Sequence, residues 1–144
     1  MYSRILIPTD GSEITRKAVE TAVSLAKRMD AQLFAIAVKE PFPYSAISEV
    51  QPIAPQEFFD AQEKVARARA TAVVEAAREQ QVACSGYTVE SIHPWEAILE
   101  HARDKQCDLI VMASHGRRGV AAVLLGSETQ RVLLHSPIPV LVVK

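Results

Sequence analysis

The sequence predicts an α/β fold, with a five-stranded parallel sheet, doubly wound, in a three-layer α/β/α sandwich. Short continuous apolar runs, which are typical of strands buried on both faces, alternate with segments of helical period. The helical segments between the runs imply parallel pairing, because a parallel strand needs a long crossover connection. The length suits one domain, so we expect residues 1–144 to form a single domain.

The first half of the chain predicts two strands, each followed by a helix. Residues 5–7 are the first apolar run, and residues 13–29 carry apolar side chains at helical spacing. Residues 32–38 are the second run, and residues 57–80 predict the longest helix. We expect its core-facing stripe to consist of Phe58, Ala61, Val65, Ala68, Ala72 and Ala76. The proline-rich segment 39–56 resists regular structure and is either a lid or a mobile connection.

The second half predicts three more strands and two helices. A partly polar run at 82–89 indicates a strand at the edge of the sheet, and residues 95–105 predict a helix. Residues 108–112 and 140–143 predict the last two strands, with a helix at 127–135 between them.

The composition excludes several classes of protein. The formal charge of −1 offers no basic surplus for a nucleic acid, and the apolar runs are too short to span a membrane. The start of the chain lacks the pattern of a signal peptide, which predicts a cytoplasmic protein. Cys84 and Cys107 are far apart in the sequence, which favours buried thiols over a disulfide or a metal site.

Three predicted strands end in residues suited to binding a ligand. The first ends at Pro8-Thr9-Asp10, the second at Val38, and the fourth runs into residues 112–116. In open α/β sheets, ligands bind beyond the carboxyl ends of the strands, where the strand order reverses. An acid, an apolar wall and a loop rich in N–H donors at that edge suit a purine nucleotide.

The loop after the fourth strand has a glycine at each end. Gly116 is followed, after nine residues, by Gly126-Ser127 at the start of a predicted helix. Backbone N–H groups and the helix dipole favour an anion at such a place. Ser127 also suits the N-cap position, with Gln130 three residues on to complete a capping box. The alternative stays open that Gly126 and Ser127 only make a turn and start a helix.

The segments PTDGS, ASHGRRGVAAVLLGSET and PIPVLVV, in this order over essentially the whole chain, resemble the universal stress protein family. The resemblance implies a Rossmann-like fold of the adenine nucleotide alpha hydrolase type. The ATP-binding subgroup carries a glycine, two residues, a second glycine, nine residues and Gly-Ser or Gly-Thr. Here Gly116 and Gly126-Ser127 match, and Ala113 replaces the first glycine. Its methyl group fits where the backbone φ is negative and not where φ is positive.

The resemblance also implies roles for the site residues. Asp10 would hydrogen-bond the adenine edge beside Pro8 and Thr9, and Val38 would offer backbone groups to the base. The ribose and the phosphates would be contacted by Met112, Ala113, Gly116, Arg117, Gly126, Ser127 and Glu128. Arg117 is equally a candidate for a solvated loop charge. Glu128 is either an acid that suits the helix dipole or one that a Mg²⁺ ion bridges to the phosphates.

Signals of catalysis are absent from the sequence. It contains neither a GxxxxGK[ST] loop nor a GxGxxG turn after the first strand, and no nucleophile is visibly paired with His115. We therefore expect no catalytic residue, no protein-built metal site and at most a weak ATPase. Together with the resemblance, this favours an ATP-binding regulatory protein of the stress response with slow or no hydrolysis. Two alternatives stay open, a dimeric interaction module that binds no nucleotide and a weak Mg²⁺-dependent ATPase.

Residues 139–143 predict a short apolar strand, and an exposed edge strand of this kind needs a partner or a cover. Because members of the family commonly dimerise by pairing their last strands, the resemblance implies a homodimer through 139–143. The alternative is that the run only fills the core.

Overall fold

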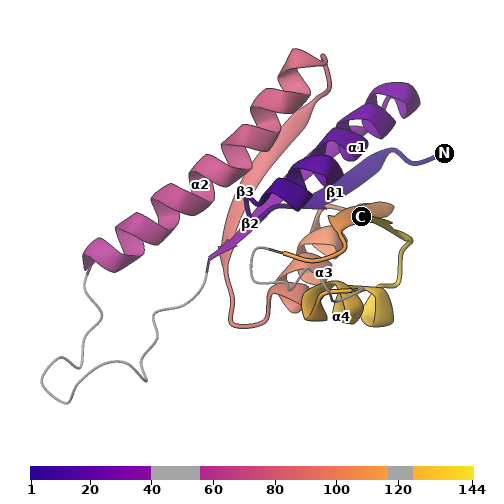
Figure 1. Cartoon of the computed structure of the whole chain (residues 1–144). Helices are drawn as coiled ribbons and strands as arrows, with labels where there is room; N and C mark the ends of the chain where they lie inside the picture. Colours follow the sequence, from indigo (N-terminus) through magenta and orange to yellow (C-terminus); the bar gives the residue numbers. More distant parts are fainter. Residues whose placement is uncertain (40–55, 117–124) are drawn as a thin grey trace, which may run out of the picture.

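The computed structural model describes residues 1–39, 56–116 and 125–144, and it confirms the predicted fold class. Five parallel strands form one sheet in the order β3-β2-β1-β4-β5. The elements are β1 (Arg4–Pro8), α1 (Glu13–Met29), β2 (Gln32–Lys39), α2 (Gln56–Glu79), β3 (Cys84–Glu90), α3 (Pro94–Asp104), β4 (Leu109–Ala113), α4 (Ser127–His135) and β5 (Val140–Val143). Helices α1 and α2 cover one face of the sheet, and α3 and α4 cover the other (Figure 1).

Side chains of the central strands alternate between two buried clusters, because helices cover both faces of the sheet. In β1, Ile5 and Ile7 face α1, whereas Leu6 faces the side of α3 and α4. All three side chains are fully buried. The sheet therefore separates two apolar layers, and its central strands position the loops that follow them.

The partly polar strand lies at an edge of the sheet, as predicted. It begins at Cys84 rather than at Val82, and six of its seven residues are half-buried, whereas Glu90 is exposed. The other predicted boundaries differ from the observed ones by at most one residue, and those of α1, α4 and β5 coincide.

The predicted core stripe of α2 is wrong, except that the half-buried Ala76 packs against the core. The buried residues of this helix are Ala66, Ala70, Val73 and Ala77. The predicted stripe was Phe58, Ala61, Val65, Ala68, Ala72 and Ala76, of which Val65 is 46% exposed. Alanine occurs all round the helix, so the apolar pattern selects no face. Close packing selects it, since a Cβ on Gly86 of β3 would lie only 3.4 Å from the Ala70 Cβ.

Within the described ranges, none of the helices has the length and the hydropathy needed to cross a lipid bilayer.

Candidate functional site

The strand order reverses between β1 and β4, at the centre of the sheet. The loop after β1 leads to α1 on one face, whereas the loop after β4 leads to α4 on the opposite face. Loops that diverge in this way open a crevice at the carboxyl edge, the usual ligand site of a doubly wound fold. Asp10 and Gly116, which the sequence proposed for one site, lie in these two loops.

Hydrogen bonds hold the loop after β1 in place. The Thr9 N–H donates to the Ile36 carbonyl of β2 at 2.9 Å, and Thr9 is buried. The Asp10 Oδ1 atom accepts from the Ser12 N–H at 2.9 Å and from the Thr15 hydroxyl at 2.7 Å. The carboxylate of Asp10 is thereby oriented at the start of α1.

Gly116 approaches Asp10 closely at the carboxyl edge of the sheet. A Cβ atom added to Gly116 would lie 2.7 Å from the Asp10 Oδ2 atom, which is closer than real Cβ contacts. The two loops therefore meet, and bare backbone at position 116 lets them do so. A side chain here would displace the carboxylate or the loop.

The far end of the second loop is also closed tightly. The Gly126 N–H donates to the Ser114 carbonyl at 2.7 Å, which joins the two ends of the loop. A Cβ on Gly126 would lie 3.1 Å from the His115 Cα atom. Arg117, predicted near the phosphates, lies outside the described residues.

The predicted N-cap of α4 is wrong. Gly126, with extended backbone, is the N-cap, and Ser127 is the first helical residue. Gln130 does not complete a capping box, because its side-chain amide donates to the Leu125 carbonyl at 2.9 Å. Glycine has no side chain that could satisfy the first N–H groups of the helix. These groups point toward the loop, at the positive end of the helix dipole.

Ala113, which replaces a motif glycine, causes no backbone strain. Among the described residues, a positive φ outside glycine occurs only at Asp30, Gln81 and Gln106. The Ala113 side chain is buried in the cluster beneath α1. Its carbonyl accepts from the buried Thr129 hydroxyl at 2.9 Å, which ties the first turn of α4 to β4. The added methyl group thus belongs to the core.

Val38 and Met112 contribute to the opposite face. Met112 is buried in the cluster beneath α3 and α4, and the half-buried Val38 packs against the same cluster. Each is the last-but-one residue of its strand, near the carboxyl edge. Pro8, the last residue of β1, is also half-buried there. These apolar side chains lie near the edge where the sequence predicted an apolar wall for a ligand, and that role stays a prediction.

Glu128 makes a contact that the sequence did not reveal. Its Oε2 atom accepts from the Trp95 N–H, in the first turn of α3, at 2.8 Å. The two residues are 33 positions apart, so no local pattern could have indicated the bond. A second unforeseen pair is Ser114 and His115, whose Oγ and Nδ1 atoms lie 3.2 Å apart. Ser114 is buried and is not an accessible nucleophile.

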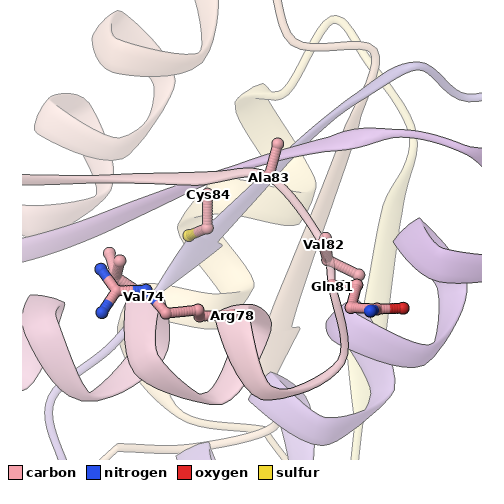
Figure 2. Close-up of a pocket in the computed structure, with 6 residues that line it drawn as sticks. All are labelled: Val74, Arg78, Gln81, Val82, Ala83 and Cys84. Atoms are coloured by element: carbon pink, nitrogen blue, oxygen red, sulfur yellow. The ribbon is translucent and has the colours of Figure 1, made fainter.

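A shallow hollow of about 320 Å³ lies elsewhere, at the amino end of β3. Its lining is Val74, Arg78, Gln81, Val82, Ala83 and Cys84 (Figure 2). Burial raises the pKa of the Cys84 thiol to about 11, so this thiol stays protonated and unreactive at neutral pH. In the part of the chain that the structure describes, no three His, Cys, Asp or Glu side chains gather as metal ligands.

Comparisons with known proteins agree on one family. The model of the Universal stress protein family matches residues 1–144. Universal stress protein MJ0531 of Methanocaldococcus jannaschii is 33% identical over 150 residues, covering 100% of this chain and 83% of the relative.

Solved structures give the same result for the fold. The structure of MJ0577, also from Methanocaldococcus jannaschii, aligns with a TM-score of 0.85 at 28% identity, covering 100% of this chain and 96% of that one. A universal stress protein solved in complex with cAMP aligns with a TM-score of 0.69 at 26% identity, covering 99% and 97% of the two chains.

Proposed function

The chain belongs to the universal stress protein family, and from that premise we propose that it is a cytoplasmic regulatory protein of the stress response that binds ATP with slow or no hydrolysis. One observation carries the proposal. Gly116 comes so close to Asp10 that the loops after β1 and β4 meet, which brings an acid and a residue without a side chain together at the carboxyl edge. A similar protein in complex with cAMP supports an adenine nucleotide as the ligand.

The base would lie on the side of β1 and β2. Asp10 is oriented by Ser12 and Thr15, and its Oδ2 atom faces Gly116. A carboxylate in this place can accept a hydrogen bond from the amino group of adenine. Pro8 and Thr9 would shape this side, and the backbone at the end of β2, at Val38, would contact the ring. The ribose would lie beside Met112 and Ala113, whose methyl group faces the core.

The phosphates would lie between Gly116 and the start of α4. Gly126 has no capping side chain, so the N–H groups of Ser127 and its neighbours suit an anion. Arg117 would add a positive charge. A Mg²⁺ ion, if bound with ATP, would be held chiefly by phosphate oxygens and water. Because the Glu128 carboxylate bonds to Trp95, we do not assign it to that ion.

The test is binding of ATP by the purified protein. Nucleotide should be released on heat denaturation, or millimolar ATP should raise the melting temperature. Asp10→Ala and Gly126→Val should abolish the shift. Asp104→Ala, at an exposed position on α3, and Gly86→Ala, where a Cβ is similarly crowded at 3.1 Å, are matched controls that should keep it.

Absence of both released nucleotide and a thermal shift would refute ATP binding. A shift that survives Asp10→Ala and Gly126→Val would place the site elsewhere. Release of inorganic phosphate above that of a Ser127→Ala variant would instead favour a Mg²⁺-dependent ATPase.

We also propose a homodimer through residues 139–143. β5 is an edge strand, and Leu141 on it is 39% exposed. Leu134 of the adjacent α4 is 78% exposed, so apolar surface extends beyond the strand. Light scattering at micromolar concentration should give a dimer mass. Leu141→Lys should give a monomer, and Val65→Lys, at a similarly exposed apolar residue on α2, should leave the dimer intact.

A further inference from the structure

Helix α3 begins without a cap of its own. Its N-cap residue, His93, makes no side-chain cap hydrogen bond, and Pro94 in the first turn has no N–H group. Trp95 therefore carries the first N–H group of the helix, and this group donates to the Glu128 carboxylate at 2.8 Å. Because Glu128 belongs to α4, it caps α3 from a neighbouring helix.

The same carboxylate lies in the first turn of α4. Glu128 follows Gly126 and Ser127, so it stands at the positive end of its own helix as well as at that of α3. One negative charge thus serves two helix N-termini, where it is favourable at both. A further anion at the start of α4 would be repelled by it.

Trp95 lies where its fluorescence would report a change at the start of α4. It is the only tryptophan of the chain. Its ring stacks on that of His135, in the last turn of α4, with centroids 4.6 Å apart and planes at 24°. The half-buried ring also packs against the core cluster beneath α3 and α4. Trp95 therefore contacts α4 at the first turn through its N–H and at the last turn through its ring.

We propose that Glu128 is a positioning residue that couples the charge at the start of α4 to α3, so that Trp95 responds to the phosphate groups of a bound nucleotide. The inference rests on the proposed function. The Trp95 N–H holds the carboxylate on the α3 side, which leaves the first N–H groups of α4 to the phosphates. Repulsion by the phosphates acts on the carboxylate, and through its hydrogen bond on the first turn of α3.

The test combines calorimetry, which measures binding, with the fluorescence of Trp95. ATP should change the emission of the wild-type protein, AMP should change it less, and adenosine should leave it unchanged. Glu128→Gln should bind ATP about threefold more tightly, because a like charge is removed, and its emission should not respond. Glu96→Gln, at an exposed acid in the first turn of α3, is the matched control and should respond like the wild type.

Several results would overturn the inference. An equal emission change with adenosine and ATP would do so, and so would a change that survives in Glu128→Gln. ATP binding with silent Trp95 fluorescence would overturn this inference alone, whereas no ATP binding by the wild type would overturn the proposed function together with it.

Hydrogen exchange tests the capping contact without nucleotide. The Trp95 amide proton should exchange about tenfold faster in Glu128→Ala than in the wild type, because its charged acceptor is gone. The Glu96→Ala variant should leave that rate unchanged. Equal exchange in the wild type and in Glu128→Ala would overturn the cap and the coupling that depends on it.

Discussion

Helices α1 and α4 both begin at the carboxyl edge of the sheet, but their first turns are held in different ways. In α1, the Ser12 hydroxyl caps the Thr15 N–H at 3.4 Å, a contact within a single turn. In α4, the N-cap is Gly126, and the side chains of the first turn reach distant elements. Thr129 bonds to β4 across 16 residues, and Glu128 bonds to α3 across 33.

The first turn of α1 is thus held by a contact within the turn, whereas that of α4 is held by contacts with other elements. At the start of α1, the Ser12 side chain accepts from the Thr15 N–H of the same turn. Among the described residues, the start of α4 makes its long-range contacts through the side chains of Thr129 and Glu128. This arrangement suits the anion that we propose at α4.

The largest expected difference in stability is between substitutions of the glycines in the two loops. Gly126→Val should lower the free energy of unfolding by about 3 kcal/mol, because its Cβ would press on the His115 backbone. Gly11→Ala, before α1, should cost only about 1 kcal/mol, which is the strain of a side chain at a φ of 74°. Urea denaturation measures both. Equal losses would show that the two loops are equally tolerant.

The contact between α4 and β4 should have the next largest effect. Thr129→Val keeps the shape of the buried side chain but removes its hydrogen bond to the Ala113 carbonyl. The free energy of unfolding should fall by about 1–2 kcal/mol. Thermal or urea denaturation checks this value. A loss below about 0.5 kcal/mol would mean that the carbonyl finds another partner and that the anchor is dispensable.

The local cap of α1 should matter less. Ser12→Ala should cost about 1 kcal/mol, which is typical of a lost N-cap. Ser12→Asp should restore most of that stability, because Asp is an equally good cap. Failure of Asp to restore it would indicate that the contact between the Ser12 and Thr15 hydroxyls at 2.9 Å, and not the cap, stabilises this turn.

In a third helix, α2, an ion pair should make the stability of the protein depend on pH. Glu63 of α2 contacts Lys39 of β2 at 2.8 Å, Arg67 at 2.9 Å and the Thr88 hydroxyl of β3 at 3.1 Å. The Lys39 ammonium, followed by the Arg67 guanidinium, lowers the pKa of Glu63 from 4.5 to about 2. A lowered pKa adds stability above the unfolded value, which is lost as the pH falls from about 4.5 toward 2.

Urea denaturation between pH 2 and pH 6 measures this contribution. The Glu63→Gln variant should show a shallower fall in stability over that range than the wild type. Glu79→Gln, at an exposed acid at the end of the same helix, is the control and should follow the wild type. Parallel curves for the wild type and Glu63→Gln would show that the three contacts contribute nothing measurable.

Local chemistry accounts for most of the fold and for part of the candidate site. Alternation of apolar runs with helical periods predicted the order of the elements, and the position of Asp10 after the first strand predicted its place at the carboxyl edge. The meeting of Asp10 with Gly116 followed from topology, because parallel strands that reverse their order bring those two loops together. The roles of both residues toward ATP stay predictions.

Hydrophobic period and the bonds of a single turn are local properties, so they were enough to predict which segments form strands and helices. Four features came to light only in the folded chain: the buried face of α2, the N-cap of α4, the direction of the Ala113 methyl group and the partner of Glu128. Each of these depends on residues far apart in the chain, where several local arrangements differ by about 1 kcal/mol and packing selects one.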